Sequence, residues 1–440
     1  MGLERVVTTG DKGKKSRVLS GMRPTGRLHI GHYFGALQNW VRLQNDPAYE
    51  CFYFIADWHA LTSDYADTSA IAENTLQIMI DYLAAGLDPA KSVIFQQSAV
   101  PEHAELHLLL SMVTPLGWLE RVPTYKEALE NVKDKDLHNY GFLGYPVLQC
   151  ADIVIYSSPD IAGLFVPTGE DQVSHVETSR EIVRRFNGTL LTVKPGIVNY
   201  LLNSEHGPGL LRGELKMELA EASEIRRPDE FAEHARNYTV PAVREAIQQI
   251  GLENFLDDFP DAKVFIERPD PLVEPESMLT KTPRIPGLDG RKMSKSYGNT
   301  ITLSESDADI RAKTKVMVTD PARKRRSDPG NPDVCPVYDW HKLFSPKPTL
   351  EWAAQGCRTA GIGCIECKAK MADHLIEWIT PVRERRVKYE KNPKQVLELL
   401  DDGSNKARKV AQGTMARVRE AVFGWGKKKV EIGVVNRASV

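Results

Sequence analysis

The segment RPTGRLHIGHYFGALQNW (residues 23–40) follows directly on a short apolar run, RVLSGM (17–22). A helix is predicted to begin within its HIGH sequence because apolar residues recur there at helical spacing: Ile30, Phe34, Leu37 and Val41. His29 and His32 then lie in or beside the first turn. The free N–H groups and the positive dipole end of such a turn favour a phosphate group.

Three glycines surround the two histidines, and Gly26, Gly31 and Gly35 would let a flat base or a phosphate come close to the backbone. The alternative interpretation is that His29 and His32 are ordinary surface residues, as histidines near a helix start usually are. On its own, the segment therefore indicates a strand, a turn and a helix that carry a candidate phosphate site.

The rest of the first half of the chain alternates between strand-like and helical patterns. Further apolar runs of strand length are ECFYFIADW (50–58), SVIFQQS (92–98) and AGLFVPTG (162–169). Helical patterns such as residues 67–89 separate them, which predicts a parallel sheet with crossover helices and ligands at the carboxyl ends of the strands. Neither common nucleotide-binding fingerprint is present, because the P-loop spacing from Gly21 to Gly26 is followed by Arg27 and Leu28 where Lys and Ser or Thr are required.

Composition excludes several classes of protein. The 440 residues carry a formal net charge of −2 and the apolar fraction of an ordinary globular chain, enough for two or three domains. No run of apolar residues is long enough to span a bilayer, and the polar start lacks the apolar core of a signal peptide. A myristoylation signal is excluded because Val6 stands where Ser or Thr is required. A cytoplasmic protein with no membrane segment is expected.

A second motif, GLDGRKMSKSYGN (287–299), lies far along the chain. Lys292 and Lys295 put two ammonium groups on one short loop, and neutral donors come from Ser294, Ser296 and Asn299. Such a loop suits a leaving pyrophosphate, whose developing charge needs mobile cations. The alternative interpretation is a solvated basic loop.

The six cysteines divide into two groups. Cys51 and Cys150 lie in apolar runs and are predicted to be core residues. The other four, Cys335, Cys357, Cys364 and Cys367, follow the spacing C-x21-C-x6-C-x2-C. Clustered cysteines in a reducing compartment are more often metal ligands than disulfides, and four thiolates suit either a 4Fe-4S cluster or Zn²⁺. The unequal spacing favours 4Fe-4S, and four unligated cysteines remain the alternative.

The HIGH and KMSKS sequences, in this order on a parallel α/β frame, are the paired signature of class I aminoacyl-tRNA synthetases. Within that class the chain resembles bacterial tryptophanyl-tRNA synthetases over roughly residues 17–188 and 270–425. The segments that carry the resemblance are SGMRPTGRLHIGHYFGAL, LERVPTYKE, YPVLQCADIVIY, VPTGEDQVSHVETSREIVRRFN, RIPGLDGRKMSKSYGN and DPARKRRSDPGNP. One branch of this family carries a similar four-cysteine motif and binds a 4Fe-4S cluster.

The resemblance implies roles for individual residues in amino-acid activation by ATP. His29 and His32 would stabilise the α-phosphate, and the departing pyrophosphate would be neutralised by Lys292, Lys295 and Lys126. The other residues expected to bind ATP, with its Mg²⁺, are Met22, Arg23, Gly31, Gly169, Glu170, Asp171, Met293, Ser294 and Ser296.

The resemblance also implies a tryptophan site. Asp152 would accept the indole N–H, and Tyr145 and Gln172 would hold the amino end. A site built around a buried hydrogen bond can reject analogues by about 10⁴ to 10⁵. The alternative for Asp152, which lies in an apolar helix, is a paired core residue. Many family members carry Met where Gln149 stands and Gln where Arg23 stands.

The predicted fold class is α/β, with a Rossmann-like parallel-sheet catalytic domain, a helical insertion and a helical C-terminal domain. The predicted boundaries are 17–188 and 269–310 for the catalytic domain, 189–268 for the insertion, 311–425 for the anticodon-binding domain with the four cysteines, and 426–440 for a tail. A helix with an apolar face is predicted within 371–393, and another after a Ser404 cap. The densest basic run, residues 323–326, is either a tRNA contact or a solvated face.

The expected partners are tRNA(Trp), L-tryptophan and a second copy of the chain, since the family is dimeric. Three other interpretations stay open. A tyrosyl-tRNA synthetase shares the fold and both motifs. A small-molecule nucleotidyltransferase also uses a HIGH-type helix but does not need the long helical C-terminal domain. A metal-binding RNA-interaction protein without catalysis would not need intact HIGH and KMSKS motifs.

Overall fold

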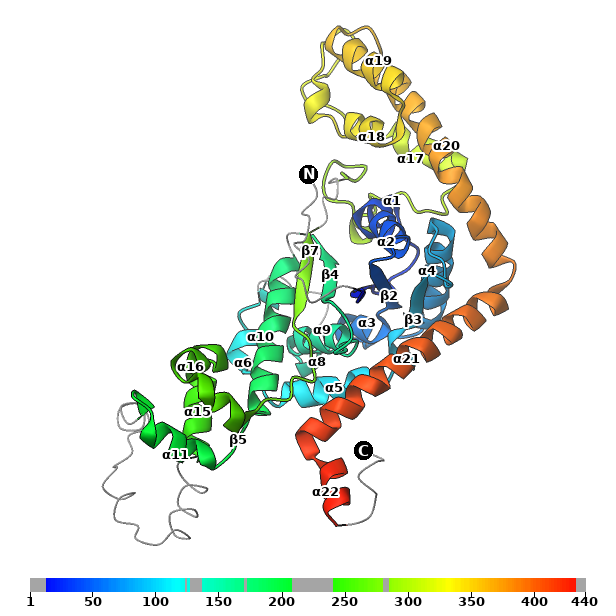
Figure 1. Cartoon of the computed structure of the whole chain (residues 1–440). Coiled ribbons are helices and arrows are strands. Elements are labelled where there is room, and N and C mark those ends of the chain that lie inside the picture. Colours follow the sequence, from blue (N-terminus) through cyan, green and yellow to red (C-terminus); the bar gives the residue numbers. More distant parts are fainter. Residues whose placement is uncertain are drawn as a thin grey trace, which may run out of the picture.

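The computed structural model describes residues 13–122, 125–126, 137–169, 172–207, 240–279 and 285–432. Its centre is a five-stranded parallel sheet with the order β3-β2-β1-β4-β7 (Figure 1). The strands are β1 (Ser16–Met22), β2 (Tyr49–Ile55), β3 (Ser92–Gln96), β4 (Leu164–Thr168) and β7 (Pro275–Leu279). The first four are the predicted strands, so the predicted fold class is confirmed. The fifth was not predicted, because the short sequence PESML has little apolar character.

Helices cover both faces of the sheet because neighbouring residues of a strand point to opposite sides. Val18 and Tyr53 face a cluster that includes α1 (Ile30–His32), α2 (Gln38–Gln44) and α4 (Ile71–Ala85). Leu19 and Phe52 face a second cluster. The helices on that side are α5 (Glu102–Ser111), α9 (Tyr145–Val154) and α10 (Val173–Thr189). Cys51 and Cys150 are buried in these clusters, as predicted.

The described part of the insertion forms a lobe of its own (Figure 1). Its helices are α11 (Gly196–Asn203), α15 (Val240–Ile250) and α16 (Leu252–Asp258). They share a small core. A short antiparallel pair of strands, β5 (Thr192–Val193) and β6 (Ile266–Glu267), links the segments where the chain enters and leaves this lobe. The sequence did not predict this pair. Residues 208–239 of the predicted helical insertion lie outside the described residues.

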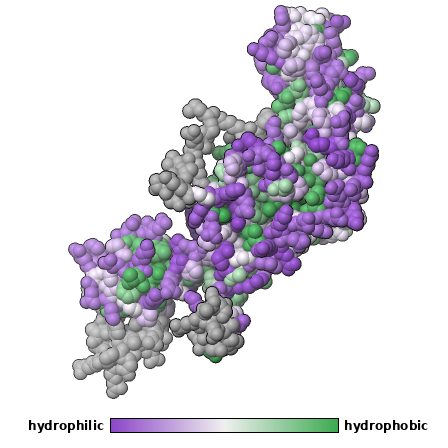
Figure 2. Space-filling model, turned by 45° about the vertical axis from the view of Figure 1, so that its right-hand side comes forward, coloured by the Kyte–Doolittle hydropathy of each residue, from purple (hydrophilic) through white to green (hydrophobic). Residues whose placement is uncertain are grey.

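The C-terminal part is helical. Its helices are α17 (Asp307–Lys315), α18 (Pro336–Phe344), α19 (Lys347–Arg358), α20 (Cys364–Glu390), α21 (Pro393–Phe423) and α22 (Trp425–Glu431). Helices α18 and α19 project as a lobe whose visible face is mainly hydrophilic, at the top of Figures 1 and 2. From this lobe, α20 runs back to the catalytic domain. No helix among the described residues is long and apolar enough to cross a membrane.

Helix α21 corrects one prediction about a cap and packs against the sheet. Ser404 is not an N-cap, because the helix begins at Pro393, behind Asn392. Instead, the Ser404 hydroxyl accepts a hydrogen bond of 3.2 Å from the Gln96 N–H on the edge strand β3. The second half of α21 buries Ala407, Ala411, Met415 and Val418 in the cluster behind the sheet. This half of α21 thus packs against the sheet, while the division into domains, with 311–425 as an anticodon-binding domain, stays a prediction.

Candidate active site

The HIGH sequence forms the start of a helix, as predicted. His29 caps α1, and the main-chain N–H of His32 donates to His29 Nδ1 over 3.3 Å. In return, the His29 N–H donates to His32 Nδ1 over 3.2 Å, and the two rings stack with centroids 3.6 Å apart. A π-helical segment (Tyr33–Leu37) then joins α1 to α2. The two histidines are thus fixed relative to each other at the carboxyl end of β1.

Both histidines are neutral at physiological pH. Burial and the nearby Lys295 ammonium lower the pKa of His29 to about 4. Burial, His29 and Lys295 lower the pKa of His32 to about 2. Each Nδ1 accepts a main-chain N–H, so each ring carries its proton on Nε2. A neutral imidazole of this kind is a hydrogen-bond donor for a phosphate oxygen.

The KMSKS sequence packs directly on HIGH. The ammonium of Lys295 donates to the carbonyl oxygens of Thr25 (3.2 Å) and Gly26 (2.7 Å). Gly31 is covered from both sides, since a Cβ added there would lie 2.9 Å from the His29 ring and 3.3 Å from Met293 Sδ. The two motifs, more than 250 residues apart in sequence, therefore form one site.

Asn299 holds the KMSKS loop together from inside. Its amide oxygen accepts from the Ser294 N–H (2.8 Å), and its amide nitrogen donates to Asp289 (2.7 Å) and to the Lys292 carbonyl (3.1 Å). The same side chain leaves no space for a Cβ at Gly287. The loop is preorganised, with Lys292 exposed on it.

Other predicted ATP-binding residues lie at the same edge of the sheet or are only partly described. Met22 ends β1, Arg23 follows it, and Gly169 follows β4. Lys126 is described and exposed. Glu170, Asp171 and the Ser296 side chain lie outside the described residues.

Asp152 is fully buried in α9 and has three partners. Its Oδ2 lies 2.6 Å from His59 Nε2. Its Oδ1 lies 2.6 Å from His103 Nδ1 and accepts from Gln97 Nε2 over 2.7 Å. Burial alone would raise the pKa of Asp152, but the contacts with His59 and His103 outweigh it and lower the pKa to about 2.

Sequence reasoning missed all three of these partners. Gln97 comes directly after β3, and His59 lies in the first turn of the helix that follows β2; both are near strand ends where ligands are expected, and that position is a signal that could have found them. His103 continues the network, with its Nε2 2.9 Å from the Tyr156 hydroxyl. The other two predicted tryptophan residues, Tyr145 and Gln172, begin α9 and cap α10.

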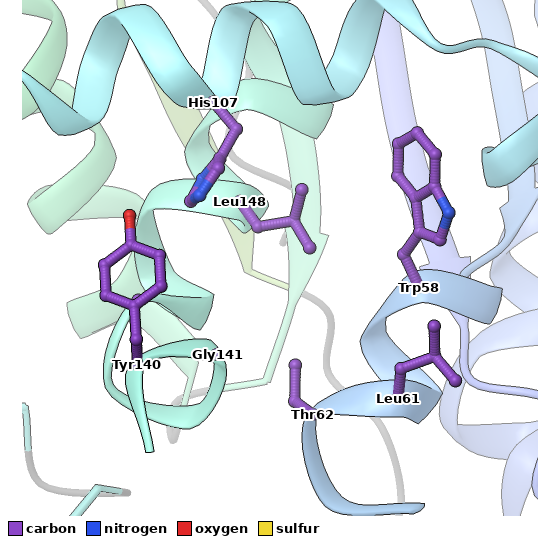
Figure 3. Close-up of a pocket in the computed structure, with 8 residues that line it drawn as sticks. Trp58, Leu61, Thr62, His107, Tyr140, Gly141 and Leu148 are labelled. Atoms are coloured by element: carbon purple, nitrogen blue, oxygen red, sulfur yellow. The ribbon is translucent and has the colours of Figure 1, made fainter. Parts of the chain in front are cut away.

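A cavity of about 190 Å³ opens beside this network (Figure 3). His107 and Leu148 point into it from one side, and Trp58 and Leu61 of α3 (Asp57–Asp64) lie opposite. Its lining includes Trp58 and Gly144, the immediate neighbours of His59 and Tyr145 in sequence, so the cavity adjoins the predicted tryptophan site.

The four clustered cysteines are neighbours at the ends of three helices. Cys335 caps α18, Cys357 lies at the end of α19, and Cys364 and Cys367 form the first turn of α20. Burial, and then the other three thiols, raise the pKa of Cys367 to about 12. His341 of α18 places its Nε2 3.3 Å from Cys367 Sγ.

The thiols are close but not arranged as ligands, since no group of three or more His, Cys, Asp or Glu side chains in the described ranges could hold a metal ion. Their donor chemistry fits an iron-sulfur cluster or zinc, whereas the geometry is not preformed. Arg323, part of the basic run predicted to be either a tRNA contact or a solvated face, is buried beside this cluster. Its guanidinium donates to the carbonyls of Arg326 (3.0 Å) and Ile362 (2.6 Å), so it holds these loops rather than facing solvent.

Comparison with known proteins places this site in a class. The family described as "tRNA synthetases class I (W and Y)" matches residues 11–209 and 252–380, so the chain belongs to that family. Among curated relatives, the chain is 50% identical to the tryptophan--tRNA ligase of Ralstonia nicotianae, over 92% of this chain and 98% of the relative. It is 42% identical to the tryptophan--tRNA ligase of Thermotoga maritima, over 92% and 98%.

Solved structures give the same family. Tryptophanyl-tRNA synthetase from Campylobacter jejuni, complexed with ADP and tryptophan, superposes with a TM-score of 0.67 at 28% identity, covering 92% of this chain and 99% of that one. Tyrosyl-tRNA synthetase from Archaeoglobus fulgidus has a TM-score of 0.50 at 16% identity, which shows a shared fold alone. The predicted family is thereby confirmed.

Proposed function

We propose that the protein is a tryptophan--tRNA ligase, which activates L-tryptophan with ATP and transfers it to the 3′ end of tRNA(Trp). The observation that carries the proposal is 50% identity to such a ligase over nearly the full length of both chains. Tyrosine is the second candidate substrate, since the family includes tyrosyl enzymes. It is disfavoured because the tyrosyl enzyme compared above shares only the fold.

In the first step, a carboxylate oxygen of tryptophan attacks the α-phosphorus of ATP. The bond from this phosphorus to the oxygen bridging to the β-phosphate breaks, and pyrophosphate leaves with that electron pair. In the second step, a ribose hydroxyl at the 3′ end of the tRNA attacks the carbonyl of the adenylate and AMP leaves. The protein supports these steps mainly by positioning and by charge.

His29 and His32 act on the α-phosphate as neutral donors, because both pKa values are too low for an imidazolium. Their Nε2–H groups would bind the oxygens on which negative charge increases in the transition state. Lys292, Lys295 and Lys126 would neutralise pyrophosphate together with the Mg²⁺ that accompanies ATP. Lys295 would exchange its two carbonyl acceptors, Thr25 and Gly26, for phosphate oxygens.

The remaining ATP contacts come from the backbone and polar groups around these side chains. We propose that they are supplied by Met22, Arg23, Gly31, Gly169, Glu170, Asp171, Met293, Ser294 and Ser296. Close approach at Gly31 is supported by the absence of room for a side chain there.

Asp152 would recognise the indole N–H through Oδ2. A carboxylate oxygen can accept two hydrogen bonds. Oδ1 already has two partners, His103 and Gln97, whereas Oδ2 has only His59 in the described part of the chain. One acceptor position is therefore left for the indole N–H. Tyr145 and Gln172 would hold the amino group of tryptophan.

Pyrophosphate exchange into ATP, assayed with tryptophan and with tyrosine side by side, tests the proposal. We expect exchange that depends on tryptophan and falls strongly in the Lys295→Ala variant. Exchange supported by tyrosine and not by tryptophan would replace the proposed substrate. No exchange with either amino acid, by protein that binds ATP, would overturn the proposed activity.

We further propose that Cys335, Cys357, Cys364 and Cys367 hold a 4Fe-4S cluster, with Zn²⁺ as the alternative. The support is the proximity of four thiols in one lobe and the resemblance to the cluster-binding branch. A bound centre would supply a rigid connection between the loops that precede α18 and α20 and the end of α19. Iron, sulfide and zinc analysis of anaerobically purified protein distinguishes the two; protein without metal would contradict both.

A homodimer is the proposed assembly. Large apolar side chains are exposed on and around α5 and α8 (Tyr140–Leu143), on the side of the sheet away from α20: Leu108, Met112, Leu116 and Tyr140. Met112, for example, is 72% exposed, and a group of exposed apolar side chains is typical of a protein interface. Size-exclusion chromatography with light scattering should give twice the chain mass of 49.3 kDa. A Met112→Glu variant should elute as a monomer. If that variant remained a dimer, the interface would lie elsewhere.

A further inference from the structure

A fully buried carboxylate lies directly behind the HIGH segment. Asp81 is on α4, among apolar neighbours, and is 0% exposed. Its Oδ2 accepts the main-chain N–H of Leu28 over 2.7 Å, and its Oδ1 forms an ion pair with Arg386. Without these partners the charge could not remain at this depth, because burying an unpaired carboxylate is very costly.

Leu28 is the residue immediately before His29, and both sides of it are fixed. Its N–H is bound by Asp81, and its carbonyl accepts the Leu303 N–H over 2.8 Å. Leu303 lies just beyond the KMSKS loop. The start of the HIGH segment is therefore hydrogen-bonded on one side to α4 and on the other to the segment that follows KMSKS. Asp81 supplies the hydrogen bond on the α4 side.

Arg386 reaches Asp81 from the other end of the chain. It lies near the end of α20, 305 residues from Asp81 in sequence, and is 1% exposed. Its guanidinium also contacts the Gln77 side chain on α4 and lies 3.1 Å from Glu390. Cys364, at the start of the same helix, is 22 residues away, about 33 Å along the axis at ~1.5 Å per residue. The ion pair thus joins the C-terminal helices to the backbone of the active site.

We propose that Asp81 and Arg386 are positioning residues for adenylate formation. Arg386 keeps Asp81 ionised in the interior, and Asp81 fixes the Leu28 peptide and with it His29 and His32. Both residues are buried and act through the backbone rather than on the substrate itself. The proposal rests on the proposed activation reaction, in which the two histidines meet the α-phosphate. Displacement of a catalytic group by about 1 Å can cost ~10² in rate.

Arg385 provides a matched control. Arg385 immediately precedes Arg386 on α20. Its guanidinium donates to the carbonyl of Ala84, which lies on α4 as Asp81 does, over 2.7 Å. It therefore contributes to the same docking of α20 on α4 but makes no hydrogen bond or ion pair to Asp81 or Leu28 among the described contacts. A general loss of docking should affect an Arg385→Ala variant, whereas a positioning effect should not.

The experiment compares Asp81→Ala, Arg386→Met and Arg385→Ala in full-length protein, at a temperature where all three are folded by circular dichroism. We expect kcat for pyrophosphate exchange to fall about 10²-fold in the first two variants, with tryptophan binding changed less than about threefold. Arg385→Ala should keep kcat within about threefold of the parent. The double variant Asp81→Ala/Arg386→Met should lose little more than either single variant, because both act through one contact.

Peptide-resolved hydrogen exchange supplies a readout that does not depend on the reaction. Amides of residues 27–32 should exchange faster in Asp81→Ala and Arg386→Met than in the parent and in Arg385→Ala. Unchanged protection of this segment, or equal losses of kcat in all three variants, would overturn the positioning role. If the unmodified protein showed no pyrophosphate exchange, the proposed function would be overturned instead. The hydrogen-exchange protection of residues 27–32 would still decide whether Asp81 and Arg386 position this segment.

Discussion

Raising the pH should remove the charge of Lys295 well before an ordinary lysine loses its proton. Burial lowers the pKa of Lys295 from 10.5 to about 8, and the nearby Asp81 carboxylate only partly opposes this shift. The charged form is the one that binds phosphate, so activity should be present below this pKa and lost above it. Because kcat/KM reports ionisations of the free enzyme, kcat/KM for ATP should fall about tenfold per pH unit above the Lys295 pKa.

Binding of ATP should move this decline in activity, the alkaline limb of the pH profile, to higher pH. The phosphates favour the ammonium form, so the corresponding decline in kcat should occur at higher pH than the decline in kcat/KM. The assay is tryptophan-dependent pyrophosphate exchange over a series of buffers at constant ionic strength. Constant ionic strength matters because the exposed part of the site is screened by salt.

Two variants decide whether Lys295 is the group that titrates. Lys295→Arg keeps a cation throughout and should remove the limb, although the arginine fork will lower the absolute rate. Lys295→Ala should reduce kcat/KM by about 10² to 10³ near neutrality, the usual loss for one group that stabilises transition-state charge, and should also lack the limb. A limb that persists in either variant, or a parental profile that stays level up to the pKa of an ordinary lysine, would refute the reasoning.

Three further outcomes are expected. Asp152→Ala should raise KM for tryptophan about 10- to 100-fold, the equivalent of a charge-assisted hydrogen bond of ~1.5 to 3 kcal/mol, with KM for ATP nearly unchanged; equal effects on both would argue for a purely structural Asp152. Gly403→Ala should lower the free energy of unfolding in urea by about 1 to 3 kcal/mol or more, because the new Cβ would lie 1.7 Å from the Ile94 carbonyl oxygen. Gly413→Ala on the same helix is the control: its new Cβ would have no neighbour within 4 Å, and it should raise the free energy of unfolding by ~0.5 to 1 kcal/mol. Cys364→Ser should impair tRNA charging more than pyrophosphate exchange, and parallel losses in folded protein would show that the cysteine lobe acts on adenylation.

The parts of the molecule that could be predicted from sequence are those with a local signal. β1 to β4 are apolar runs, and α4 ends at Gly86, which has the left-handed φ of 111° expected of its C-cap. The pairing of HIGH with KMSKS was predictable because two fixed motifs occurred in a known order. The contacts through Lys295 and Gly31 show how that pairing is built.

The parts that could not be predicted depend on partners far away in the chain. Nothing near Asp81 in sequence indicates that an arginine 305 residues later will neutralise it. Arg323 was predicted to contact tRNA or to face solvent because charge density is visible in sequence, whereas its hydrogen bonds to the Arg326 and Ile362 carbonyls are decided by tertiary packing. His103, the partner of Asp152 on α5, has no such signal either, because only tertiary packing brings α5 against α9.

The position of α21 sets a condition on biosynthesis. Strand β3 is the edge of the sheet, and its outer side is closed only when Gly403 and Ser404 arrive against Ile94 and Gln96. An open edge strand can pair with another chain. Ser404 follows Gln96 by 308 residues, so the ribosome must extend the chain well into α21 before this edge can be covered. The outer edge of β3 therefore stays open until α21 is in place, and a truncation that removes α21 would leave this edge exposed.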